Sequence, residues 1–98
     1  MLFAIIFKDK PHQAELRIKY LNEHILWLEE NRNTIPIGGS LRNELGQNPI
    51  GGLWIARADT EQELHALIQT DPFYLNGLRE SYEIHFWSKS NSERMVEL

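Results

Sequence analysis

An uninterrupted apolar run, Leu2 to Phe7, stands at the start of the chain. A run of this length without polar interruption is typical of a buried strand at the centre of a sheet. It stops at Lys8-Asp9-Lys10-Pro11, where proline prevents further strand pairing. Later segments must therefore supply neighbouring strands on both sides of residues 2–7.

Two helices are predicted from hydrophobic spacing and capping. The first extends from His12 to about Asn31, and its apolar residues recur at steps of three and four, forming one stripe that we expect to be buried: Ala14, Ile18, Leu21, Ile25 and Leu28. The second begins at a capping box, in which the Thr60 hydroxyl accepts the Glu63 amide and the Glu63 side chain returns a bond to the Thr60 amide. It runs to about Gln69.

Three further strands complete the pattern, at residues 34–41, 51–57 and 82–87. Pro36 favours an edge position or a bulge for the first of them. The order is β-α-β-β-α-β, and right-handed crossovers then place both helices on one face of a four-stranded antiparallel sheet. The predicted fold class is α+β, with the ferredoxin-like arrangement.

The other face of this sheet lacks a cover, although strands 51–57 and 82–87 carry apolar side chains on both sides. A second copy of the chain is the simplest cover, so we expect a homodimer in which two sheets pack face to face as a dimeric α/β barrel. No repeats or linkers divide the chain. We expect a single domain over residues 1–98, with a polar C-terminal tail over 88–98.

Composition excludes several classes of function. The 98 residues carry a net charge of -4 without a Lys/Arg cluster, which argues against nucleic acid and anionic membranes as partners. The absence of cysteine excludes disulfides and thiolate chemistry. The N-terminal apolar run is too short for a signal peptide and has no basic segment before it, so we expect a cytoplasmic location.

His24 and Asp71 are the best candidates for catalysis. His24 flanks the apolar stripe of the first helix, as Tyr20 and Trp27 do. We therefore expect its ring to lie where the edge of the helix meets the sheet. A carboxylate that accepts the Nδ1 proton of an imidazole fixes the tautomer that a general base requires. Asp71 lies downstream, directly before Pro72, and is the predicted partner.

Each residue also has a structural alternative. His24 is equally well explained as a half-buried histidine bonded to a backbone carbonyl or to Glu23. Asp71 before Pro72 is a standard N-cap with proline at the first helical position. Capping and pairing with His24 are compatible, because a carboxylate has two oxygens.

Glycine pairs stand at both ends of one hairpin, Gly38-Gly39 and Gly51-Gly52, and allow a ligand or another backbone to approach closely. Turns and bulges are the alternative explanation. We predict that Gly39, Ser40 and Phe73 contact a substrate. No phosphate-binding glycine motif is present, and the spacing of His12, His65 and His85 predicts no metal site, so no cofactor is expected.

The order of these motifs along most of the chain resembles the YciI-like (YCII-related) family. The motifs are the helical histidine, the glycine pairs, Asp71-Pro72-Phe73, Asn76-Gly77-Leu78 and a last strand ending Ile84-His85-Phe86-Trp87. The resemblance implies a small dimeric α/β barrel with a catalytic His/Asp pair, which falls here on His24 and Asp71.

The chain departs from the family pattern at two places. Asn31-Arg32-Asn33 lacks the glycine often found at the end of the first helix, and Gly38-Gly39 replaces a more usual Gly-Pro. We expect the first change to alter the C-terminal cap of the helix and the second to alter the shape of the pocket floor.

These features favour a cofactor-independent enzyme for a small-molecule substrate. In this hypothesis His24 moves a proton in an elimination or isomerisation step, of the lyase or isomerase type, and Asp71 orients it. The alternative is a non-catalytic dimeric module that binds a metabolite or another partner. A haem- or flavin-linked monooxygenase is compatible with the fold, but no cofactor motif supports it.

Overall fold

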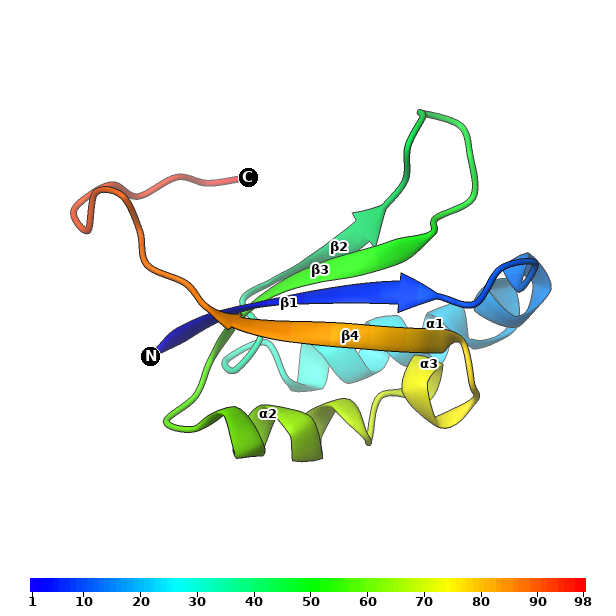
Figure 1. Ribbon diagram of the computed structural model, residues 1–98, viewed down its shortest axis with the longest axis horizontal. Coiled ribbons are helices and arrows are strands. Elements are labelled where there is room, and N and C mark those ends of the chain that lie inside the picture. The colour runs from blue at the N-terminus through cyan, green and yellow to red at the C-terminus, as the bar shows by residue number, and fades with distance from the viewer.

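The computed structural model describes residues 1–98 as a four-stranded antiparallel sheet with all helices on one face (Figure 1). The elements are β1 (Leu2–Asp9), α1 (Ala14–Glu30), β2 (Ile37–Leu41), β3 (Gly51–Arg57), α2 (Glu61–Ile68), α3 (Pro72–Leu75) and β4 (Arg79–Phe86). The strand order is β2-β3-β1-β4. The ferredoxin-like prediction is confirmed, with β1 as an inner strand and β2 at the edge.

Two predicted strand boundaries are wrong by three residues. β2 begins at Ile37 because the Ile35 amide donates to the Asn31 carbonyl at the end of α1, although the Thr34 carbonyl already accepts a bond from the Arg57 amide of β3. β4 begins at Arg79, because Arg79 already pairs with Asp9 of β1. Both differences matter for the site, since Arg79 enters it from the first position of β4.

The predicted capping box at α2 is half correct. The Thr60 hydroxyl accepts the Glu63 amide at 3.3 Å, as expected. The Glu63 carboxylate, however, accepts a bond from the Asp59 amide at 3.3 Å, one residue before the cap. Only the bond to the Glu63 amide satisfies a free amide of the first turn of α2, while the bond from Asp59 holds the residue that precedes the cap.

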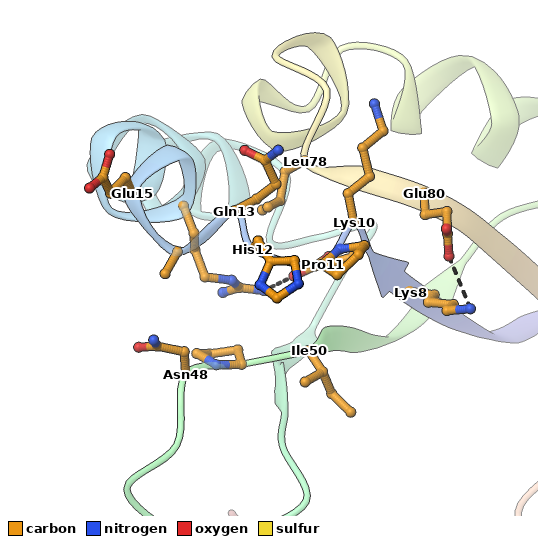
Figure 2. Close-up of a pocket in the computed structure, with 14 residues that line it drawn as sticks. Lys8, Lys10, Pro11, His12, Gln13, Glu15, Asn48, Ile50, Leu78 and Glu80 are labelled. Carbon is orange, nitrogen blue, oxygen red and sulfur yellow. Dashed lines mark hydrogen bonds and ion pairs between the residues drawn. The ribbon is translucent and has the colours of Figure 1, made fainter.

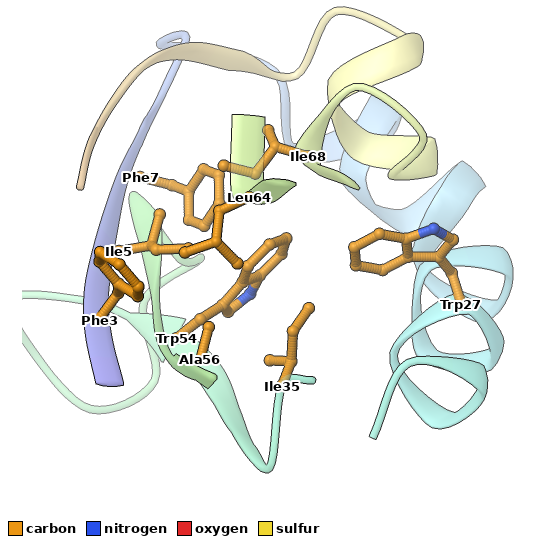
Figure 3. Packing of buried hydrophobic residues seen from close by; sticks show 9 residues of the cluster. All are labelled: Phe3, Ile5, Phe7, Trp27, Ile35, Trp54, Ala56, Leu64 and Ile68. Atoms are coloured by element: carbon orange, nitrogen blue, oxygen red, sulfur yellow. The ribbon is translucent and has the colours of Figure 1, made fainter. Parts of the chain in front are cut away.

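The hydrophobic core lies between the sheet and the helices (Figure 3). Alternate residues of β1 point inward, because side chains of a strand alternate between its faces. Trp54 is 1% exposed and packs between Phe7, at a ring distance of 4.4 Å, and Trp27 of α1, at 5.4 Å. The cluster consists of Phe3, Ile5, Phe7, Trp27, Ile35, Trp54, Ala56, Leu64 and Ile68.

The predicted buried stripe of α1 is wrong by a rotation of the helix. Ile18 and Ile25 are 71% and 52% exposed, whereas Arg17, His24 and Trp27 are buried. A shift of one residue turns an α-helix by about 100°. Arg17 bonds to Asp9 and His24 bonds to Asp71, and these bonds hold both side chains in the interior. Their contribution to stability outweighs the free energy that burial of the two isoleucines would provide.

The opposite face of the sheet carries no helix (Figure 1). Directly paired residues point to the same face, and the register pairs Ile6 with Leu53 and both Ala4 and Ile37 with Ile55. The apolar side chains on this open face are Leu2, Ala4, Ile6, Ile37, Leu41, Leu53 and Ile55. No helix of the structure combines the length and apolar character needed to cross a membrane.

Candidate active site

Five ionisable side chains are buried near one end of the sheet: Asp9, Arg17, His24, Asp71 and Arg79. The topology brings them together. Asp9 continues the inward alternation of β1, and the antiparallel register places Arg79 of β4 beside it. Arg17 and His24 lie seven residues apart, which is two turns along one face of α1.

The His24 and Asp71 side chains form a short hydrogen bond, with 2.6 Å between Nδ1 and Oδ1. An ionised carboxylate only accepts hydrogen bonds, so Nδ1 carries the proton. The other ring nitrogen, Nε2, makes no hydrogen bond with the protein. In the neutral ring Nε2 therefore has a free lone pair, as a general base requires.

Asp71 also caps α3, as the sequence predicted. The Phe73 amide donates to the same oxygen, Oδ1, at 3.1 Å. The second oxygen, Oδ2, is buried without a partner. Capping and pairing thus share one oxygen, which differs from the expectation that each would use its own.

Phe73 and Trp27 fix the plane of the imidazole. The Phe73 ring stacks on His24 at 3.9 Å between centroids, and the Trp27 indole donates to the Thr70 hydroxyl at 3.0 Å. Both contacts join α1 to the segment that carries Asp71. Phe73 is 1% exposed and does not line the cavity; it contacts His24 instead, and its predicted contact with a substrate stays a prediction.

Arg17 and Arg79 share the carboxylate of Asp9. Arg17 Nη2 lies 2.9 Å from Oδ2, and Arg79 Nη1 lies 2.7 Å from Oδ1. Burial lowers the pKa of Arg79 from its usual value, against the hydrogen bond and charge of Asp9, which raise it. A guanidinium keeps its charge under such conditions, so both arginines are buried cations.

A cavity of about 190 Å³ lies between α1 and the edge of the sheet. Its size suits a single ring, since a cavity of roughly 150 Å³ accommodates benzene. Gly39 and Ser40 line it, and the Ser40 hydroxyl accepts a bond from Arg42. Their contact with a substrate stays a prediction. The full lining is Arg17, Leu21, His24, Ile25, Leu28, Gly38, Gly39, Ser40 and Arg79.

A larger and more open cleft of about 910 Å³ lies at the N-terminal end of α1 (Figure 2). Its walls come from residues 8–15, 48–50 and 78–80, together with Arg17. Neither His24 nor Asp71 lines it, whereas His24 lines the smaller cavity. Arg17 contributes to both spaces.

No group of three or more histidine, cysteine, aspartate or glutamate side chains is arranged to hold a metal ion. His65 Nδ1 instead lies 2.7 Å from the Tyr82 hydroxyl, and His85 is exposed beside Glu83. His12 is exposed with a φ of 61°, in the left-handed region. These three histidines do not join the buried cluster.

Three residues of the buried cluster, Asp9, Arg17 and Arg79, are not among those predicted from the sequence. Asp9 belongs to the polar stretch that ends the apolar run of β1, but it shares the alternation of Phe3, Ile5 and Phe7. The spacing of Arg17 and His24 by two helical turns was the second available signal. Arg79 gave no signal, because it preceded the predicted strand.

The chain is similar to the members of one protein family and to several solved structures. The family model described as YCII-related domain matches residues 1–88. The chain is similar to 5-chloro-2-hydroxyhydroquinone dehydrochlorinase from Burkholderia phenoliruptrix, solved in complex with 2,5-dihydroxybenzoquinone. The two share 30% identity and a TM-score of 0.82, over 90% of this chain and 94% of that one.

More distant structures share the fold alone. A candidate antibiotic biosynthesis monooxygenase from Bacteroides thetaiotaomicron has 14% identity and a TM-score of 0.59, over 99% of this chain and 95% of that one. A NIPSNAP domain protein from Burkholderia xenovorans has 10% identity and a TM-score of 0.52, over 97% of this chain and 100% of that one. No curated protein matches the chain.

Proposed function

Because the chain belongs to the YCII-related family, we propose that it is a cofactor-independent enzyme acting by proton transfer on a small, single-ring substrate. The observation that carries this proposal is the 2.6 Å bond between His24 Nδ1 and Asp71 Oδ1, next to a ring-sized cavity. His24 is the proposed base, acting through Nε2. Asp71 holds the tautomer and the orientation of the ring.

The reaction class is an elimination. The reacting form of the substrate is its keto tautomer, in which a hydroxyl proton has moved to the chlorine-bearing carbon and made it tetrahedral. His24 Nε2 takes a proton from a remaining O–H or C–H bond of this tautomer, and the freed electron pair moves through the ring to form a new π bond at the chlorine-bearing carbon. A leaving group such as chloride departs with its own bonding pair, so the substrate loses HCl in total. Asp71 stabilises the imidazolium that forms, and no oxidant or reductant is consumed.

The proposed substrate class is a chlorinated, hydroxylated ring. The similar dehydrochlorinase, at 30% identity, supports this choice. The cavity walls agree with it, because Leu21, Ile25 and Leu28 offer apolar contact to a ring while His24 and Ser40 offer polar groups.

Chloride release by the purified protein tests this function. Chlorinated polyhydroxybenzenes are incubated with the protein under anaerobic conditions, with EDTA and without added cofactor, and chloride is measured by ion chromatography. We expect catalytic release above the protein-free rate. Ring binding without release across the panel would contradict the enzyme and support the alternative of a non-catalytic binding module.

We also propose that the open face of the sheet binds a second copy of the chain. Ile6 and Ile37 are 40% and 44% exposed at the middle and edge of this apolar face. Exposed contiguous apolar surface on a monomer marks an interaction site. A sheet of the same kind from a second copy complements it by two-fold symmetry.

An Ile55→Lys substitution is expected to abolish this dimer. The new charge would be buried between the two sheets beside Ala4 and Ile37, which offer it no partner charge. Light scattering should give twice 11.5 kDa for the wild type and 11.5 kDa for the variant. Ile18→Lys is the matched control, since Ile18 is 71% exposed on α1, away from the open face. A monomeric wild type would refute the proposed dimer.

A further inference from the structure

We propose that Arg17 and Arg79 form an anion-binding subsite in the 190 Å³ cavity, so that its ligand carries an ionised oxygen on the ring. This inference rests on the proposed function, because it takes the cavity as the substrate site. It adds a requirement that the His24 and Asp71 pair does not impose. The substrate class narrows to planar oxygen anions, such as ring enolates, phenolates or carboxylates.

The first support is the sharing of a single carboxylate by two buried cations. Asp9 accepts one bond from each arginine, at 2.9 Å from Arg17 and 2.7 Å from Arg79. Asp71 is the only other buried carboxylate, and it attracts Arg79 electrostatically without a hydrogen bond to it. Its bonded oxygen is used by His24 and the Phe73 amide.

The second support is the number of free donors. Each guanidinium has five N–H donors. Arg17 uses Nη2 for Asp9 and for the Gly51 carbonyl, and Arg79 uses Nη1 for Asp9. The Nε atoms of both arginines are buried without any partner. Arg17 Nη1 and Arg79 Nη2 bond to no protein group and are not buried in this way, so they are the donors that a bound anion would use.

The third support is that both side chains are held in place beside His24. The Arg79 guanidinium lies over the Phe7 ring at 4.4 Å, and Arg17 lies over Phe73 at 4.9 Å. Gly52 leaves room for Arg79, since a Cβ there would lie 3.4 Å from Arg79 Nη2. Both arginines line the cavity together with His24. Such fixed donors bind a planar anion with little loss of conformational entropy.

This placement gives the arginines a direct part in recognition. An ionised ring oxygen bound by Arg17 and Arg79 lies in the same small cavity as His24 Nε2. The ring then has one orientation relative to the base.

Binding by the wild-type protein is the first arm of the test. Calorimetry compares 2,5-dihydroxybenzoquinone, which is ionised at neutral pH, with benzoate and with neutral hydroquinone. We expect at least one anion to bind about tenfold or more tightly than hydroquinone. The ranking of the two anions separates enolate from carboxylate oxygen. Equal affinity for neutral and anionic rings, or no anion binding at all, would overturn the subsite.

Arginine variants are the second arm. In Arg79→Gln, and in Arg17→Gln, we expect anion affinity to fall about 10- to 100-fold, with hydroquinone affinity within about threefold of wild type. Arg79→Lys keeps the positive charge but loses the planar arrangement of guanidinium donors. Its anion affinity should lie between those of the wild type and Arg79→Gln. Arg32→Gln is the control, because Arg32 is exposed and pairs only with Glu29. Circular dichroism confirms folding of each variant.

The two proposals fail in different ways. Arginine-dependent anion binding without chloride release would refute the proposed elimination and leave the subsite standing. Chloride release with no preference for anions, in wild type or variants, would refute the subsite and leave the elimination standing.

Discussion

Asp9→Asn is expected to lower the free energy of unfolding by about 3 to 5 kcal/mol. The substitution keeps the shape of the side chain and removes its charge. Arg17 and Arg79 then remain buried, with 11% and 2% of their side chains exposed, and lose their shared counter-ion. Removing one member of a buried ion pair costs more than the pair contributes, because an uncompensated charge stays in the interior.

Urea unfolding of wild type and variant measures this loss at neutral pH. Asp59→Asn is the matched control, since Asp59 is exposed and its carboxylate bonds to no protein group. We expect the control to change stability by less than about 0.5 kcal/mol. A change of that small size in Asp9→Asn would show that solvent reaches the arginines, and it would weaken the anion subsite as well.

The fold was predictable because its signals are local. The apolar run of β1, the spacing in both helices and the chain order specify a sheet with two crossovers, whatever the details of packing. Boundaries were less predictable where side-chain or backbone bonds outside the sheet decide them. Ile35 is an example, since its amide is taken by the end of α1.

The rotation of α1 could not be predicted from apolar spacing alone. Ile18 and Ile25 each directly follow a residue that the structure buries, Arg17 and His24. The helix could therefore bury either of two stripes that are offset by one residue, one apolar and one polar. The polar stripe is buried because Arg17 pairs with Asp9 at the end of β1 and His24 pairs with Asp71, which lies 47 residues further along the chain. Such long-range pairing leaves no periodic trace near the helix.

The pairing of His24 with Asp71 was predictable from residue types, motif order and family resemblance. The arginines of the cavity were not, because a charge beside apolar residues ordinarily indicates a solvated position. Asp9 shows the difficulty most clearly. It ends β1 between Lys8 and Lys10, which are both exposed, yet it is 8% exposed itself.

Asp71→Asn is expected to lower kcat for the proposed elimination by about 10²- to 10⁴-fold. Asparagine is as good an N-cap as aspartate, so the bond to the Phe73 amide and the start of α3 are retained. The neutral amide no longer requires the proton on Nδ1 of His24. The ring can then carry its proton on Nε2, which removes the lone pair that accepts the substrate proton.

Steady-state kinetics of Asp71→Asn, His24→Gln and the double variant measure this dependence. Residues that act as one unit give non-additive losses, so the double variant should be about as slow as the slower single variant. Thr60→Ala is the control for capping: it removes the side-chain cap of α2, costs about 1 kcal/mol of stability and leaves kcat unchanged. Wild-type kcat in Asp71→Asn, or losses that multiply in the double variant, would mean that Asp71 only caps α3 and that His24 acts alone.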